Sequence, residues 1–199
     1  MSDRIRIVSE PAALRPPPVR FVGYGQPKIG KTSFASWWPK PIILQTEDGS
    51  AGLDVPKIPE TPCRNWEEVM QSLRIILKED HDRKTLVIDT LDRTESLAQE
   101  FVLRTVHGGN QEKYMSYYKG PILAGEMMSQ VLSALDHIRK RKEMNIVLIA
   151  HDGLQPGANA LGEDFKKWAP SLSKYAWTIV RDWADQIGHF QSDFRVVNG

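Results

Sequence analysis

The sequence predicts an α/β fold in which a mostly parallel β-sheet is covered by helices on both faces. Two observations indicate this class. Apolar runs such as TLVID at 85–89 and NIVLIA at 145–150 have the composition of strands that are buried on both faces. Segments with apolar residues at helical spacing separate these runs, and strands that alternate with helices are typical of a parallel sheet.

The apolar patterns place strands and helices in alternation along the chain. The predicted strands cover, in chain order, residues 20–24, 41–46, 85–89, 145–150 and 186–191. The predicted helices cover residues 31–38, 66–79, 91–106, a segment around 128–138, and 172–183. No internal repeat is visible in the sequence, so the alternation does not indicate a repeat array.

Local signals mark the ends of several elements. Pro39 ends the first helix, and Asn65 can cap the second, with Glu68 at the position that completes a capping box. Gly108-Gly109 ends the third helix. The last strand and the FRVVN segment that follows it predict a C-terminal β-hairpin that turns at Ser192-Asp193.

Residues 19–199 are predicted to form one domain, preceded by an arm over residues 1–18. The arm ends in Pro16-Pro17-Pro18, which favours extended backbone, so it is expected to pair with a neighbour's sheet edge or to be a disordered leader. Residues 107–120 and 152–168 are polar and contain glycine, and we predict that both are long loops. Loops of this length in a compact domain are usually functional or disordered.

Composition excludes several classes of protein. The chain has 199 residues and a formal net charge of +1, so any basic binding surface must be local. Cys63 is the only cysteine, which excludes an internal disulfide and favours a reducing compartment. No stretch approaches the roughly 18 to 20 apolar residues of a membrane span, and no secretory signal is apparent. We therefore expect an intracellular protein.

The segment GQPKIGKT at 25–32 matches the P-loop pattern and lies between a predicted strand and a predicted helix. Gly25 and Gly30 permit backbone angles that other residues resist, so successive N–H groups can point at phosphate. Lys31 is predicted to reach the β- and γ-phosphates, and the Thr32 hydroxyl to bind Mg²⁺. The alternative is a tight glycine turn without function. The predicted nucleotide-binding residues are Gly25, Lys28, Ile29, Gly30, Lys31, Thr32 and Ser33.

A P-loop enzyme also needs a carboxylate at the end of a nearby strand to orient its metal ion. Asp89 directly follows four residues of the TLVID strand that can run through the core of the sheet. We predict that Asp89 binds Mg²⁺ together with Thr32. The alternative is an aspartate in a loop that caps the following helix.

Hydrolysis needs a base that activates water. Glu47 follows the strand at 41–46, and the carboxyl ends of parallel strands meet at one edge, so Glu47 is predicted to lie beside the P-loop and act as this base. The alternative is a solvated turn residue. Asp92 and Glu95 are further candidates, although their place on the next helix also suits surface charges. His151 ends the NIVLIA strand, where it can sense the γ-phosphate or serve as a structural residue.

The ordered segments GQPKIGKT, PIILQTEDG, KTLVIDTLD, MNIVLIAHD and IVRDWADQIGHF are similar to those of phage RecA-like NTPases. In particular, they resemble the Sak-type single-strand annealing proteins, which consist of a RecA core without its flanking domains. The similarity covers residues 20–192. It implies a RecA-like P-loop NTPase core that uses ATP and Mg²⁺, with the base at Glu47, the metal carboxylate at Asp89 and the sensor at His151.

The resemblance also implies that the segments 107–120 and 152–168 contact single-stranded DNA. Their interleaved aromatic and basic residues suit base stacking and phosphate tracking, although the tyrosines could instead pack against the core and the lysines solubilise the loops. The predicted DNA-binding residues are Lys113, Tyr114, Tyr117, Tyr118, Lys119, Lys166, Lys167 and Trp168.

By the same resemblance, we expect a DNA-stimulated, Mg²⁺-dependent ATPase of phage recombination that promotes strand annealing or pairing. A homo-oligomeric ring or filament, no membrane partner, and the cytoplasm of a phage-infected bacterial host are expected. A single-strand-binding protein is a further candidate partner. Two other functions stay open: an ATP-gated DNA-binding module with negligible hydrolysis, and a P-loop small-molecule kinase with an acceptor pocket.

Overall fold

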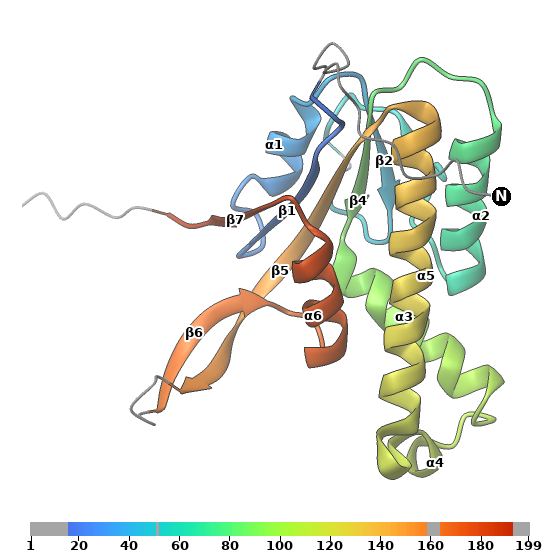
Figure 1. The fold of residues 1–199 in the computed structure, drawn as a ribbon, viewed down its shortest axis with the longest axis vertical. Helices are drawn as coiled ribbons and strands as arrows, with labels where there is room; N and C mark the ends of the chain where they lie inside the picture. The colour runs from blue at the N-terminus through green and yellow to red at the C-terminus, as the bar shows by residue number, and fades with distance from the viewer. Residues whose placement is uncertain (1–15, 51, 159–163, 193–199) are drawn as a thin grey trace, which may run out of the picture.

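A β-sheet forms the centre of the structure, a computed structural model that describes residues 16–50, 52–158 and 164–192 (Figure 1). Within these residues the sheet has seven strands in the order β3-β2-β4-β5-β1-β7, and β6 pairs with β5. The strands are β1 (Arg20–Gly25), β2 (Pro41–Gln45), β3 (Lys57–Ile58), β4 (Thr85–Asp89), β5 (Asn145–Ala158), β6 (Asp164–Pro170) and β7 (Gln186–Phe190). Every pair is parallel except β5 with β6, which confirms the predicted mostly parallel sheet.

Helices cover both faces of the sheet, as the sequence predicts. The helices are α1 (Lys31–Ser36), α2 (Trp66–Lys78), α3 (Leu91–Thr105), α4 (Gln111–Met115), the 3₁₀ turn η1 (Ser116–Tyr118), α5 (Lys119–Lys142) and α6 (Lys174–Trp183). Figure 1 shows α1 on one side of the sheet and α2, α3, α5 and α6 on the other. The larger hydrophobic core therefore lies under α2, α3, α5 and α6.

Side chains of the central strands alternate between the two cores. In β4, Leu86 and Ile88 pack in the larger core, whereas Val87 packs in the smaller core with Ala35 of α1. All five residues of β4 are buried. Since successive strand residues point to opposite faces, a slip of one residue would exchange the two sets of side chains. Burial on both faces therefore specifies the register of the sheet.

The predicted caps have direct counterparts in the structure. The side chain of Asn65 accepts a hydrogen bond from the main-chain N–H of Glu68 at 2.9 Å. The Glu68 carboxylate accepts in return from the main-chain N–H of Arg64 at 2.7 Å, one residue before the cap. These two bonds satisfy main-chain donors at the start of α2, which explains why the helix begins at Trp66.

The prediction that residues 152–168 form a long loop is wrong. Strand β5 continues past Ala150 to Ala158 and pairs with β6 in an antiparallel hairpin that projects from the body of the molecule (Figure 1). Gly153, Pro156 and Gly157 disguise the strand because glycine and proline are depleted in strands. Main-chain pairing with β6, rather than side-chain pattern, holds this part of β5.

The prediction of a long loop at 107–120 is also wrong, because the chain forms α4, η1 and the first two residues of α5 there. Asn110 caps α4 by accepting from the main-chain N–H of Lys113 at 2.9 Å. The predicted C-terminal hairpin has its first strand as β7, which pairs in parallel with β1. Its second strand was predicted at 194–198, which lies outside the described residues. Residues 1–15 of the predicted arm also lie outside them.

None of the helices in the described ranges is long and apolar enough to cross a bilayer.

Candidate nucleotide-binding site

Three parallel pairs place the candidate side chains at one edge of the sheet. Gln45 of β2 pairs with Asp89 of β4, Asp89 pairs with Ile149 of β5, and Ile149 pairs with Gly23 of β1. Glu47, His151 and Gly25 each follow this line by two residues along their own segments. The register of the sheet therefore brings the predicted base, sensor and P-loop to the same edge.

A cavity of about 480 Å³ lies at this edge. Side chains from the P-loop, the segment after β2, and the ends of β4 and β5 line it together. The lining residues are Pro27, Lys28, Gly30, Lys31, Thr32, Ser33, Glu47, Asp48, Gly49, Gly52, Leu53, Asp89, Thr90 and His151. Of the predicted nucleotide-binding and catalytic residues, all except Gly25 and Ile29 line the cavity.

The two P-loop glycines are needed for different reasons. Gly30 has φ of 97°, a left-handed conformation that favours glycine, as predicted. Gly25 does not: a Cβ at this position would lie 2.5 Å from the main-chain oxygen of Phe190 in β7. The prediction that Gly25 supplies backbone freedom is therefore wrong, because its role is to let β1 and β7 approach each other closely.

Lys31 is buried at the base of the loop. Its Nζ donates hydrogen bonds of 2.7 Å to the main-chain oxygens of Gly25 and Gln26. Burial lowers the pKa of Lys31, while nearby carboxylates, with Asp89 the strongest, oppose this shift. These two hydrogen bonds hold the ammonium group against the main chain of the loop.

Thr32 and Asp89 form a direct link between α1 and β4. Thr32 Oγ1 donates to Asp89 Oδ2 at 2.9 Å. Burial raises the pKa of Asp89, and the Thr32 bond and the Lys31 charge partly offset this. The hydroxyl and carboxylate are oxygen ligands of the kind that Mg²⁺ prefers. No group of three or more His, Cys, Asp or Glu side chains with metal-site geometry occurs in the described ranges.

Thr46 fixes the main chain just beyond Asp89. Its Oγ1 accepts from the main-chain N–H of Thr90 and donates to the Thr90 main-chain oxygen, both at 2.8 Å. The N–H of Thr46 donates to the main-chain oxygen of Asp89 at 2.8 Å. These bonds join the ends of β2 and β4, and both threonines are buried. The position of the Asp89 carboxylate therefore depends on Thr46.

His151 lies between two carboxylates. Its Nε2 is 3.5 Å from Glu47 Oε1, and its Nδ1 is 2.9 Å from Asp92 Oδ2. The bond to Asp92 raises the pKa of His151, against the effect of burial. Burial raises the pKa of Glu47, although the neighbouring His151 acts in the opposite direction. The predicted base and sensor are therefore in contact with each other.

Asp92 and Glu95, the two further candidate bases, are hydrogen-bonded to other residues. Asp92 accepts two bonds from His151, and although burial would raise the pKa of Asp92, these bonds outweigh it and lower the pKa. Glu95 is buried, and its Oε2 accepts from the main-chain N–H of Ser173 at 2.9 Å, at the start of α6. Neither carboxylate lines the cavity. The structure thus favours Glu47 among the three candidates.

Sequence reasoning missed the pairing of Asp92 with His151 and the residues that line the cavity beside Glu47. Asp48, Gly49, Gly52 and Leu53 lie in the segment after β2, which has no motif of its own. The helical position of Asp92 suited a surface charge. Only the packing of α3 against the end of β5 shows where its side chain lies.

The prediction that Tyr114 binds DNA is wrong. Tyr114 is only 6% exposed and packs with Val102 and Ala124, because Gly120 leaves room for its ring. Tyr117 and Tyr118 are 87% and 62% exposed. The side chains of the other predicted residues are also exposed: Lys113, Lys119, Lys166, Lys167 and Trp168.

We expect Thr46→Val to lower the free energy of unfolding by about 1–3 kcal/mol, because the buried Thr90 N–H loses its acceptor. The Thr90 main-chain oxygen keeps bonds from the Thr94 hydroxyl and N–H. Urea denaturation measures the loss, and Thr46→Ser, which keeps the hydroxyl, is the matched control. Equal stability of the Val and Ser variants would contradict the role given to this hydroxyl.

Comparison with known proteins supplies the family. A family model described as an AAA domain (AAA_24) matches residues 17–197. No curated protein matches the chain. The matched residues include the P-loop, the whole described sheet and the cavity at its edge. The chain therefore belongs to the AAA_24 family of AAA domains, and it is a nucleotide-binding P-loop domain of the NTPase type.

Proposed function

We propose that this protein is a Mg²⁺-dependent ATPase stimulated by single-stranded DNA, and that it serves phage recombination as a RecA-like, Sak-type annealing protein. The observation that carries the proposal is the meeting of Lys31, Thr32, Asp89, Glu47 and His151 at one cavity. These are the side chains that phosphate binding, metal binding and activation of water require. Membership of the family supports nucleotide binding. The exposed aromatic and basic residues of the β5–β6 hairpin and of the turn between α4 and α5 support binding of single-stranded DNA.

In the proposed reaction, Glu47 accepts a proton from a water molecule whose oxygen bonds to the γ-phosphorus of ATP. The bond from that phosphorus to the bridging oxygen breaks, and ADP leaves with the bonding electrons. Lys31 and the P-loop N–H groups hold the phosphates, and Thr32 and Asp89 would hold Mg²⁺, which neutralises developing charge on the phosphate oxygens. The raised pKa of Glu47 makes it a better proton acceptor than an exposed glutamate.

The order of the strands supports a sensor role for His151. Strand β5 lies between β1, which leads into the P-loop, and β4, which ends at Asp89. His151 therefore stands between the phosphate loop and the metal carboxylate. Beyond His151 the same strand continues into the β5–β6 hairpin. A group that meets the γ-phosphate is thus joined through one strand to a proposed DNA-binding segment.

The hairpin offers one face suited to single-stranded DNA. Leu154 of β5 pairs directly with Trp168 of β6, and Pro156 pairs with Lys166. Because side chains alternate along a strand, Trp168 and Lys166 share a face and Lys167 lies on the other. Trp168 is 44% exposed, so its ring is available to stack on a base while Lys166 meets the backbone phosphates.

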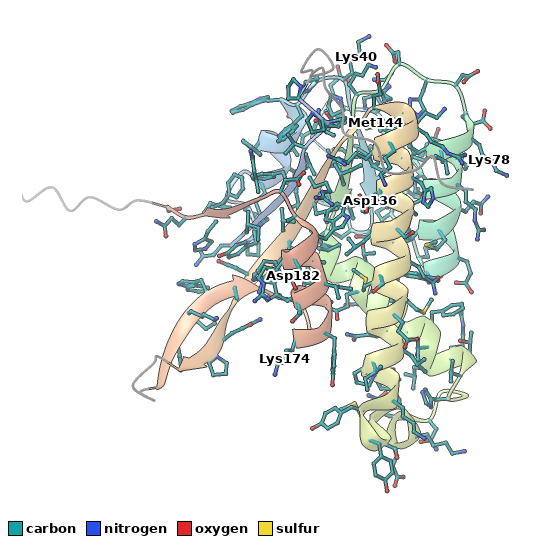
Figure 2. The ribbon with its side chains drawn as sticks, viewed as in Figure 1. Lys40, Lys78, Asp136, Met144, Lys174 and Asp182 are labelled. Carbon is teal, nitrogen blue, oxygen red and sulfur yellow. The ribbon has the colours of Figure 1, made fainter. Side chains whose placement is uncertain are left out.

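The second proposed DNA segment is the turn between α4 and α5. Tyr117 and Tyr118 have φ of 52° and 56°, a left-handed conformation that tyrosine rarely adopts. Such backbone conformations gather at functional segments. Figure 1 shows α4 and the hairpin in the same half of the view, beyond the end of the sheet where β2 and β4 terminate. Lys174, labelled in Figure 2, is the first residue of α6 and lies in the same half of the view. We propose that a single strand contacts this side of the molecule.

The first test is the ATPase rate with and without single-stranded DNA, at low and high salt. We expect stimulation that weakens as salt rises, because phosphate contacts release counterions. Lys31→Ala should abolish turnover in every condition. Turnover that is indifferent to DNA would contradict the recombination role, and transfer of phosphate to a small acceptor would favour a kinase.

We expect Glu47→Gln to reduce turnover at least tenfold, which is about 1.4 kcal/mol or more of activation barrier, while ATP affinity stays within about twofold of wild type. The amide keeps the size of the side chain but accepts no proton. Steady-state turnover and titration with a fluorescent nucleotide measure the two quantities. Unchanged turnover would remove Glu47 from the mechanism and favour an ATP-gated binding module.

We expect Trp168→Ala to weaken the affinity for single-stranded DNA roughly 5- to 150-fold, the effect of losing one stacked base at about 1–3 kcal/mol. Fluorescence anisotropy of a labelled oligonucleotide measures it. Trp37→Ala is the matched control, since Trp37 is 81% exposed but directly follows α1, which Figure 1 shows in the opposite half of the view from the hairpin. Equal affinity of the two variants would exclude Trp168 from the DNA contact.

A further inference from the structure

Asp92 makes a pair of bonds to one residue that the proposed reaction leaves unexplained. Its Oδ1 accepts the main-chain N–H of His151 at 2.9 Å. Its Oδ2 lies 2.9 Å from Nδ1 of the same residue. One carboxylate on α3 therefore holds both the main chain and the ring at the end of β5, so the imidazole has little freedom to rotate.

This geometry determines which ring nitrogen faces the cavity. A carboxylate oxygen within hydrogen-bond distance of Nδ1 keeps a proton on that nitrogen. The Nε2 atom is then directed to Glu47 Oε1 at 3.5 Å. The three residues come from three separate elements: the segment after β2, α3 and β5. Packing of the elements, rather than local sequence, creates the chain Glu47–His151–Asp92.

We propose that Asp92 is a positioning residue, which orients His151 and through it fixes Glu47 for the attack of water on the γ-phosphate. The inference rests on the proposed function, since Glu47 is the proposed base. Asp92 does not line the cavity, so it acts only through the imidazole. A histidine held on one side by a carboxylate presents its other nitrogen in one orientation, as in other sites where a third group orients a base.

Charged groups on every side of His151 bear on the test. Glu47 and Asp92 contact the ring, Asp89 on β4 interacts with it electrostatically, and Lys31 on α1 opposes its protonation. The Asp92 bond is the largest influence and raises the pKa of His151. Removing the Asp92 charge should therefore lower this pKa, and a merely structural effect of the substitution would not produce that change.

The experiment compares Asp92→Asn with Glu100→Gln, a carboxylate-to-amide change at an exposed site on the same helix. We expect Asp92→Asn to lower kcat about tenfold, with nucleotide affinity within about twofold of wild type. Asn has one side-chain oxygen and one amide nitrogen, so it cannot accept from the His151 main-chain N–H and from Nδ1 with two separate oxygens as Asp92 does. NMR titration of the His151 ring should give a lower pKa than in wild type. Glu100→Gln should change neither quantity.

A double-mutant cycle tests whether Asp92 acts through Glu47. In the Glu47→Gln background, Asp92→Asn should cause little further loss of kcat, since both substitutions interrupt the same chain. Additive losses would overturn the proposal that Asp92 acts through Glu47. If Asp92→Asn does not fold, Asp92→Glu serves instead: the charge stays, so the His151 pKa should remain raised while kcat falls.

The outcomes separate this inference from the proposed function. A wild-type protein that hydrolyses no ATP with or without DNA contradicts the proposed function. The titration of His151 needs no turnover and still tests whether Asp92 holds the imidazole, while the kcat of Asp92→Asn and the double-mutant cycle test whether that contact serves hydrolysis. A His151 pKa that is the same in wild type and Asp92→Asn would overturn the positioning role, and a lower value in the variant would support it.

Discussion

The burial of β4 and β5 on both faces is the constraint on which the rest of the structure depends. Leu86 and Ile88 face one core while Val87 faces the other, and β5 continues the same alternation with Ile146 and Val147. A shift of one residue would exchange the side chains of the two cores, so that neither core would pack as it does. Because that shift is so unfavourable, the strands can only end where they do, and the polar residues that follow them meet at one edge.

The site inherits its electrostatic character from this arrangement. The carboxylates of Glu47 and Asp89 come to the edge in surroundings where burial raises the pKa of each. The Thr32 hydrogen bond favours the charged form of Asp89, and the cationic groups of Lys31 and His151 favour the charged forms of both carboxylates. A divalent cation and a phosphate chain would add opposite charges at this place, so the proposed metal ion and nucleotide would complement the charges of the protein groups.

Much of the fold was predictable because the central strands and capped helices carry strong local signals. The TLVID and NIVLIA runs indicate β4 and the first half of β5, and Asn65 with Glu68 indicates the start of α2. The P-loop and Asp89 followed from motif and position. The second half of β5 could not be predicted, since it is a strand through its pairing with β6 and its own residues include Gly153 and Pro156.

Burial and partners of individual polar side chains were the least predictable features of the site. Tyr114 has the composition of a DNA contact, yet it packs beneath α5 because Gly120 lacks a side chain. Asp92 has the spacing of a surface residue on α3, yet both of its oxygens bind His151. In each case the deciding contact joins residues from different elements, and no local pattern records it.

The continuity of β5 has a mechanical consequence. The strand passes without a break from the buried sheet, through His151, to Ala158 in the hairpin. Seven residues at about 3.3 Å each make an arm of about 23 Å beyond His151. A tilt of about 5° with its pivot at His151 moves the far end of that arm by about 2 Å. A small rotation at His151, the residue that faces Glu47, would therefore produce a larger displacement at the far end of the hairpin.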